Sequence, residues 1–228
     1  MLILAVDTTM PSGSVALLED DVLLGEANVE SAATHSARLL RSVDFLLTAH
    51  SRDVRGVDAF AVAVGPGSFT GIRIGVGVVK SLAFASGKPV APVSTLLALA
   101  VKLAAGGPRL VCPLLDAKKE EIYAGLFEVR KAGLAEIIPQ GTYGPDAFFA
   151  RLPARRVIAF AGSGLAAYRA RLLPYVRDKA RFPRRSAFIA AEVGRIGCGM
   201  IREGKGVDAA SLEPFYLRRS QAEEKCRP

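Results

Sequence analysis

The chain repeats its own design at a shift of 109 residues. Residues 2–7 (LILAVD) form an apolar run that ends in an aspartate, and residues 110–116 (LVCPLLD) have the same pattern. The same shift places residues 15–19 (VALLE) over residues 124–128 (AGLFE) without a gap. Each copy is predicted to be a strand, an aspartate, a short polar connection and a second strand, that is, a β-hairpin with an acid at its tip.

A second echo follows in the same order. Residues 60–64 precede Gly65-Pro66-Gly67, and residues 157–161 precede Gly162-Ser163-Gly164. Two echoes predict an α/β fold of two duplicated lobes, each with a mixed sheet flanked by helices in the order β-β-(β)-α-β-α. The break at 106–108 (GGP) predicts an N-terminal lobe of residues 1–106 and a C-terminal lobe of residues 107–228, whose last residues we expect to pack back on the first lobe. Apolar spacing predicts helices over residues 35–49, 70–86, 95–104, 146–151, 164–173 and 186–203.

The charge limits the possible binding partners, and the cysteine content limits the cellular compartment. The 228 residues carry a formal net charge of +8, and arginines gather in the second half. Such a basic face can attract RNA phosphates, although a solvated surface without a partner is the reading we favour, because no aromatic residues alternate with the arginines. Three widely spaced cysteines indicate a reducing compartment.

The N-terminus and the apolar segments predict a cytoplasmic, soluble protein that does not enter a membrane. Residues 1–6 are apolar but lack a basic segment before them, so we interpret them as a strand. Arg73 and Lys80 interrupt the longest apolar segment before it reaches the ~18 residues of a membrane span.

A glycine-rich segment, residues 65–75 (GPGSFTGIRIG), connects a predicted buried strand to a predicted helix. A helix that begins after such a turn exposes free N–H groups, so this place can bind an anion or another backbone. No Lys-Ser/Thr pair closes the segment as in a Walker loop, and its spacing differs from the dinucleotide-binding pattern. Its chemistry stays open at this point. The residues that would build it are Gly65, Gly67, Ser68, Thr70 and Gly71.

Two helices are expected to share an exposed apolar surface. The helix over residues 70–86 is apolar nearly all round, and its glycines would let another helix approach closely. The helix over residues 35–49 can cover part of it, but has apolar residues away from its main leucine stripe. We therefore predict a dimer or heterodimer interface. Its candidate residues are His35, Leu39, Val43, Phe45, Ile72, Val76 and Val79.

Most catalytic arrangements are missing. His35 and His50 are too far apart for a helix-borne metal pair, so no metal site is predicted. Ser68 and Ser163 do not satisfy the G-x-S-x-G pattern of serine hydrolases. Asp7 could hold a magnesium-bound phosphate or accept hydrogen bonds from its own turn, and both roles stay open; for Asp116 we favour the local role. The candidate nucleotide-binding residues are Asp7, Thr8, Ser14, Asp116, Gly162 and Gly164.

Several motifs together resemble the TsaB (YeaZ) family over nearly the whole chain. They are residues 3–9 (ILAVDTT), 14–17 (SVAL), 65–73 (GPGSFTGIR), 93–96 (VSTL), 116–119 (DAKK), 122–123 (IY) and 214–218 (PFYLR). Lys118 departs from the arginine that is more frequent in the family. The resemblance implies an actin/Hsp70/sugar-kinase-like (ASKHA, ribonuclease H-like) fold.

The resemblance also implies a function. It is that of a non-catalytic subunit in the synthesis of N6-threonylcarbamoyladenosine (t6A) at position 37 of tRNAs that read ANN codons. The partners implied are the paralogous transferase TsaD, bound through N-terminal-lobe helices, and the ATPase TsaE. A homodimer is expected without them, tRNA contact would be indirect, and ATP or ADP would act at the level of the complex with no cofactor bound tightly. The alternatives are a nucleotide-binding ATPase or phosphotransferase of the same fold and, with little weight, a glycoprotease, as relatives were once labelled.

Overall fold

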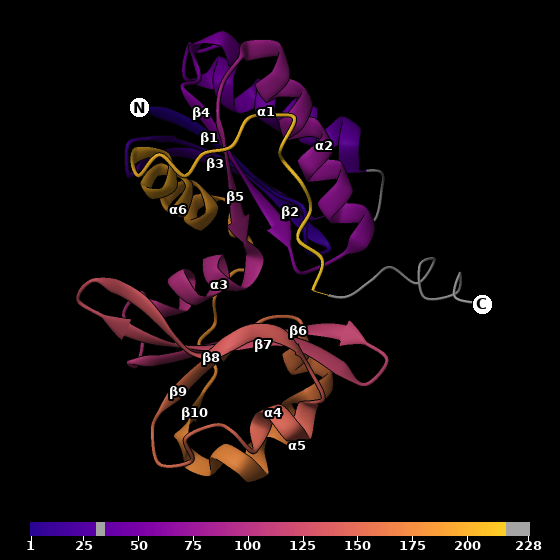
Figure 1. Cartoon of the computed structure of the whole chain (residues 1–228), viewed down its shortest axis with the longest axis vertical. Coiled ribbons are helices and arrows are strands. Elements are labelled where there is room, and N and C mark those ends of the chain that lie inside the picture. Colours follow the sequence, from indigo (N-terminus) through magenta and orange to yellow (C-terminus); the bar gives the residue numbers. More distant parts are fainter. Residues whose placement is uncertain (31–34, 218–228) are drawn as a thin grey trace. The chain divides into compact units, whose positions relative to one another are not determined.

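The first of two five-stranded sheets has the order β3-β2-β1-β4-β5 (Figure 1). The computed structural model describes residues 1–30 and 35–217. Strands β1 to β3 are antiparallel neighbours, whereas β4 and β5 run parallel to β1. The strands are β1 (Leu2–Asp7), β2 (Ser12–Glu19), β3 (Val22–Glu30), β4 (Ala59–Gly65) and β5 (Val90–Ser94).

Helices bury both faces of this sheet, which is why β1 and β4 are apolar without alternation. On one face, Leu4 and Val6 share a core with residues of α1 (His35–Ala49) and α2 (Phe69–Ser86). The alternate residues of β1 point to the other face, where α6 (Ala190–Arg202) lies. Glycines in α6 allow this contact, since a Cβ at Gly194 or Gly197 would lie less than 3.0 Å from the side chain of Leu18 or Ala61.

The second sheet repeats this design in the order β10-β9-β6-β7-β8, with β6 to β8 antiparallel and β9 and β10 parallel to β6. Its core includes Phe148, Phe149 and Phe160. Matching strand order and direction confirm the duplication. The elements are β6 (Leu110–Lys118), β7 (Glu121–Arg130), β8 (Gly133–Tyr143), α4 (Pro145–Phe149), β9 (Ile158–Ala161), α5 (Gly164–Val176) and β10 (Ala180–Arg181). Helix α3 (Thr95–Ala104) and two 3₁₀ turns (Val54–Gly56 and Arg177–Lys179) complete the elements of the described residues.

Backbone conformation extends the duplication to the two glycine turns. Gly65 after β4 has φ 121° and Gly162 after β9 has φ 122°, a region that residues with a side chain rarely adopt. A Cβ at Gly162 would also lie less than 3.0 Å from the carbonyl oxygen of Leu114. The second sequence echo therefore reflects one shared backbone turn.

The chain divides into units at other points than the sequence suggests. The first unit comprises Met1–Ala98 and Ala187–Tyr216, and the second comprises Leu99–Ser186 together with Leu217. These boundaries differ from the single division expected at residues 106/107. The reason is that α6 packs on β1, β2, β4 and β5 of the first sheet. Helix α6 begins at residue 190, not 186, where the amide of Ala190 donates to Ser14 Oγ over 3.1 Å.

Among the described helices, α2 alone is long and apolar enough to cross a membrane by those two criteria. Six of its residues are buried against the first unit's own core.

Candidate functional site

The glycine-rich segment packs against the backbone that follows β1. A Cβ at Gly67 would lie less than 3.0 Å from the carbonyl oxygen of Thr9, and one at Gly71 equally close to that of Thr8. The amide of Ser68 donates to Thr9 O over 2.7 Å. The sequence left two contacts open for this turn, an anion or another stretch of backbone. In the structure the turn packs against backbone, namely that of Thr8 and Thr9.

The polar groups of this segment are used to attach α2. Ser68 caps the helix, since its Oγ accepts from Gly71 N over 3.2 Å. Thr8 Oγ1 donates to Gly71 O over 2.7 Å. Gly75, one turn further on, faces the Thr8 hydroxyl so closely that a Cβ would overlap it. Thr70 is exposed and takes no part in these contacts.

Asp7 ends β1 and is completely buried. Its Oδ1 accepts from the amide of Thr9 (2.9 Å) and from the Thr9 hydroxyl (2.6 Å), whereas Oδ2 has no hydrogen-bond partner among the described residues. Burial raises the pKa of Asp7 to about 6, against the lowering effect of the two bonds from Thr9. This local role is one of the two that the sequence left open.

The nucleotide-binding assignment to this group needs correction. Asp7, Thr8 and Ser14 each expose 2% or less of their surface, and the hydroxyls of Thr8 and Ser14 already bond Gly71 O and Ala190 N. A magnesium-bound phosphate needs accessible oxygen ligands. These three residues do not offer them, because α2 and α6 pack over them, so the nucleotide implied by the fold finds no fitting site here.

The corresponding residues of the second unit also have structural roles. Asp116 Oδ1 accepts from the amide of Lys118 (2.8 Å), and its Oδ2 pairs with Lys118 Nζ at 2.7 Å. Partial desolvation raises the pKa of Asp116, but the bonds and charge of Lys118 outweigh it, so the pKa lies below its usual value. Gly164, like Gly162, packs on Leu114 too closely for a Cβ. Asp116 thus has the local role that the sequence favoured.

The proposed interface residues of α1 and α2 largely face inward. Leu39, Val43, Ile72, Val76 and Val79 are each 5% exposed or less and belong to the core of the first unit. They cannot anchor a partner without unfolding this core, so their assignment to an interface is wrong. The side chain of His35 lies outside the described residues.

The outer sides of these helices carry different residues. Phe84 on α2 is 82% exposed and Phe45 on α1 is 66% exposed. Gly77, also exposed, has open space where a Cβ would stand. Phe45 is the one residue of the predicted set that the structure shows on the surface. The outer side of α2 therefore carries little charge, and its exposed charged side chain is that of Arg73.

A strap of chain, which we define as residues 209–216, runs along α2 (Figure 1). Lys80 Nζ donates to the carbonyl oxygens of Ala210 (3.0 Å) and Leu212 (3.2 Å). Leu212 is buried in the core of the first unit. The strap therefore covers part of the second apolar side of α2, which the sequence assigned to a partner.

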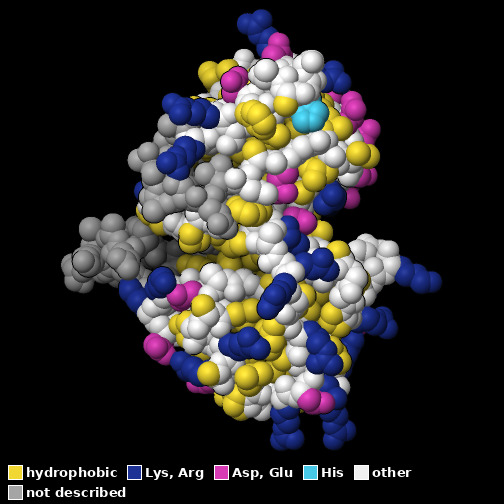
Figure 2. Space-filling view, turned by 180° about the vertical axis from the view of Figure 1, so that it is seen from behind, with side chains coloured by type: hydrophobic (Ala, Val, Ile, Leu, Met, Phe, Trp, Pro, Cys, Tyr) yellow, Lys and Arg dark blue, Asp and Glu magenta, His cyan; other side chains and the backbone are white. Residues whose placement is uncertain are grey.

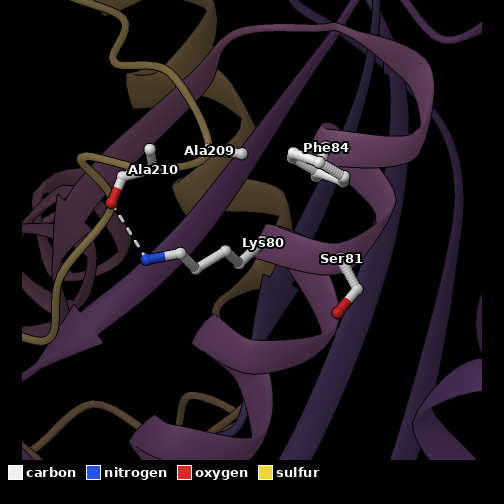
Figure 3. A pocket seen from close by; sticks show the side chains of 5 residues that line it. All are labelled: Lys80, Ser81, Phe84, Ala209 and Ala210. Carbon is white, nitrogen blue, oxygen red and sulfur yellow. Dashed lines mark hydrogen bonds between the residues drawn. The ribbon is translucent and has the colours of Figure 1, made fainter.

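The N-terminal end of α2 holds the end of the strap. The ring of Tyr216 lies 5.2 Å from that of Phe69, and the Arg73 guanidinium lies 3.8 Å above the Phe69 ring. Between the strap and the last turns of α2 lies an open pocket of about 540 Å³ (Figure 3). Helix α2 supplies Lys80, Ser81 and Phe84, and the strap supplies Ala209 and Ala210.

Sequence reasoning missed Lys80, Phe84 and Tyr216. The available signal for Lys80 was its position as a single lysine in an otherwise apolar helix. An ammonium group on such a helix is partly buried and needs hydrogen-bond acceptors. Tyr216 belongs to one of the motifs that carry the resemblance. Nothing in the sequence indicated which residue it contacts, because its hydrogen-bond partner Arg73 is 143 residues away.

His50 connects α1 to β3. Its Nδ1 lies 2.8 Å from Leu46 O, and its Nε2 lies 3.2 Å from Leu24 O. Within residues 1–30 and 35–217, no group of three His, Cys, Asp or Glu side chains is placed as a metal site would need.

Comparison with known proteins agrees with the duplicated fold. The model of the family "TsaD: tRNA N6-adenosine threonylcarbamoyltransferase" matches residues 29–182. The solved structure of YeaZ from Pseudomonas aeruginosa superposes with a TM-score of 0.80 at 29% identity, covering 94% of this chain and 99% of the other. A ROK hexokinase from Thermus thermophilus has a TM-score of 0.52 at 15% identity over 89% of this chain and 100% of its own, which shows the fold alone. The fold is therefore the duplicated α/β fold of the actin, Hsp70 and sugar-kinase type.

Two curated relatives align from end to end. The tRNA threonylcarbamoyladenosine biosynthesis protein TsaB of Escherichia coli is 30% identical over 99% of this chain and 98% of its own length. The protein of the same name in Bacillus subtilis is 29% identical over 99% of this chain and 97% of its own. The chain therefore belongs to the family that the threonylcarbamoyltransferase model describes, and among its members to the TsaB (YeaZ) proteins.

Proposed function

We propose that this chain takes part in the biosynthesis of threonylcarbamoyladenosine in tRNA, as the subunit that binds and activates the TsaD transferase. The relatives that align with almost its entire length carry TsaB names, and the matching family model is that of the transferase itself. A paralogue of the transferase that shares its fold is suited to pair with it. We expect this assembly, joined by TsaE, in the cytoplasm.

A non-catalytic role is supported by the way in which the candidate polar residues are used. Asp7, Thr8, Ser14 and Ser68 bond the chain's own backbone or neighbouring side chains. Asp116 is paired with Lys118. These residues stabilise turns and helix ends, and fold alone does not carry an activity with it.

The outer side of α2 is the surface that we assign to the transferase. The observation that carries this assignment is the exposure of Phe84, 82% of whose surface is accessible. Burying such a ring fully contributes about 2–3 kcal/mol, and Gly77 would let a partner helix approach closely. In the absence of the transferase, the same side could pair two copies around a two-fold axis.

The substitution Phe84→Glu tests this assignment. It places a charge on an exposed position, so the chain should keep its melting temperature while co-purification with the co-expressed transferase and t6A formation fall at least tenfold. Val22→Glu is the matched control, because Val22 is 65% exposed at the β2–β3 turn of the same unit. If Phe84→Glu co-purifies as well as Val22→Glu, the docking surface lies elsewhere.

A further inference from the structure

A second feature of the molecule is not used by this function: a basic surface on the second unit. The nine residues 177–185 contain five Lys or Arg and one Asp. Figure 2 shows dark-blue Lys and Arg side chains gathered on one face of the part of the molecule that holds this unit. Charge of one sign at this density attracts polyanions over a distance of about 8–10 Å at ordinary salt.

A pocket lies within this basic surface. It has a volume of about 310 Å³, and it is lined on one side by the connection between α3 and β6 and on the other by the chain that follows β10. Its lining includes Gly107, Pro108, Ala159, Arg181, Phe182 and Arg185. The site therefore combines two guanidinium groups with a small apolar floor.

The chain's own backbone holds both arginines in place. Arg181 Nη1 donates to Asp178 O (2.8 Å) and Ala180 O (3.0 Å), and Arg185 Nη2 donates to Ala105 O. Neither arginine pairs with a carboxylate among the described residues, since Asp178 pairs with Lys179. Carbonyl bonds restrain a guanidinium without neutralising it, so the remaining N–H groups keep their charge for a ligand.

The aromatic ring in the pocket favours phosphate over a base as the ligand. The Arg169 guanidinium lies 4.2 Å from the centre of the Phe182 ring, and the Phe160 ring lies 5.9 Å from it. A base-stacking platform needs a free aromatic face, and Phe182 already packs against these two groups. Arginine forks suit phosphate oxygens, and contacts of this kind position a nucleic acid without reading its sequence.

We propose that Arg181 and Arg185, with the basic surface around their pocket, bind the phosphate backbone of RNA without sequence preference. Choosing RNA among polyanions rests on the proposed role in tRNA modification, whereas the site itself belongs to the second unit and includes none of the α2 residues assigned to the transferase. The second unit would thereby hold the RNA while the first holds the transferase.

The test measures binding of fluorescein-labelled unmodified tRNA to the full chain alone by fluorescence anisotropy, between about 50 and 200 mM KCl. We expect Arg181→Gln/Arg185→Gln to weaken binding on the order of tenfold and to lower the slope of log K against log salt by about 1.5–2. The control Arg52→Gln/Arg55→Gln removes the same charge from exposed positions of the first unit, and should stay within about twofold of the unmodified chain. An unrelated RNA hairpin should bind as tightly as tRNA.

Three results would overturn the proposal: no tRNA binding by the unmodified chain, equal losses in both variant pairs, or tighter binding to phosphatidylglycerol vesicles than to tRNA. Equal losses would mean that net charge alone attracts RNA. Because this assay contains no transferase, its outcome is independent of the Phe84→Glu experiment, and either idea can fail without the other.

Discussion

Arg73 donates from Nε to the phenolic oxygen of Tyr216 over 3.1 Å, which joins α2 to a residue 143 positions later in the chain. The same guanidinium lies over the ring of Phe69, against which Tyr216 also packs. At the preceding residue, the amide of Phe215 donates to Val64 O over 2.8 Å. The strap therefore ends in a small cluster of ring, cation and backbone contacts.

Substitutions of Tyr216 should separate the ring contact from the hydrogen bond. Tyr216→Phe keeps the ring against Phe69 and loses one exposed bond, which costs less than about 1 kcal/mol. Tyr216→Ala loses both, so the amide of Phe215 should exchange its hydrogen faster, by about fivefold or more. Amide hydrogen exchange followed by mass spectrometry of the strap checks this. Equal exchange in the two variants would show that the ring does not hold the strap.

Lys80→Met should loosen the middle of the strap. The ammonium bonds the carbonyl oxygens of Ala210 and Leu212, and its loss leaves them with water as the available donor. Because Lys80 is partly buried, we expect a loss of about 1 kcal/mol in the free energy of unfolding, measured in urea. Lys88→Met, just beyond the end of α2, is the control and should change little. A stability equal to that of the control would mean that Leu212 alone fixes the strap.

Two glycines of α2 should respond in opposite directions to alanine. Gly71→Ala places a Cβ against Thr8 O, and it should destabilise the chain by about 2–3 kcal/mol or prevent folding. Gly77→Ala meets open space, and it should raise stability by up to about 1 kcal/mol because alanine favours the helix. Thermal unfolding of the two variants provides the comparison. If Gly71→Ala is as stable as Gly77→Ala, the close approach of α2 to Thr8 is not needed.

Asp7 should make the folded state less stable as the pH rises from about 4 to about 6. Its pKa in the folded protein, about 6, lies above its ordinary value of 3.8, so the folded state binds the proton more tightly than the unfolded state. The contribution is full below pH 4, is lost as the pH rises through 6, and amounts to about 3 kcal/mol. The stability difference between Asp7→Asn and the unmodified chain, measured in urea from pH 4.5 to 8, should therefore shift in favour of Asn over this range. A difference that is constant with pH would show that Asp7 does not titrate there.

Much of the fold could be predicted from local patterns. The limits of α1 and α3 follow from apolar spacing at the helical period, and the duplication followed from the two echoes around Asp7/Asp116 and Gly65/Gly162. The side of α2 that faces the sheet could not be predicted in this way. A helix that is apolar nearly all round has no periodic signal that distinguishes the sheet side, with Val76, from the outer side, with Phe84. Residues chosen as partner anchors were therefore the ones that the core uses.

Long-range contacts limited the prediction of the site. The roles of Thr8 and Ser14 depend on Gly71 and Ala190, which approach from segments 63 and 176 residues away. The strap has no period of its own, so nothing in its residues indicates that it lies on α2. A glycine-rich turn can serve an anion or a backbone equally well, and tertiary packing decided in favour of the backbone.

The first unit is assembled from two separate segments of the chain, since α6 and the strap join residues 1–98 in it. Translation delivers residues 1–98 first, but the face of the sheet that includes Ile3 and Ala5 stays bare until α6, about ninety residues later, has left the ribosome. Most of the second unit, residues 99–186, is translated before that moment. The first unit of a nascent chain can therefore close only after most of the second unit has already been synthesised.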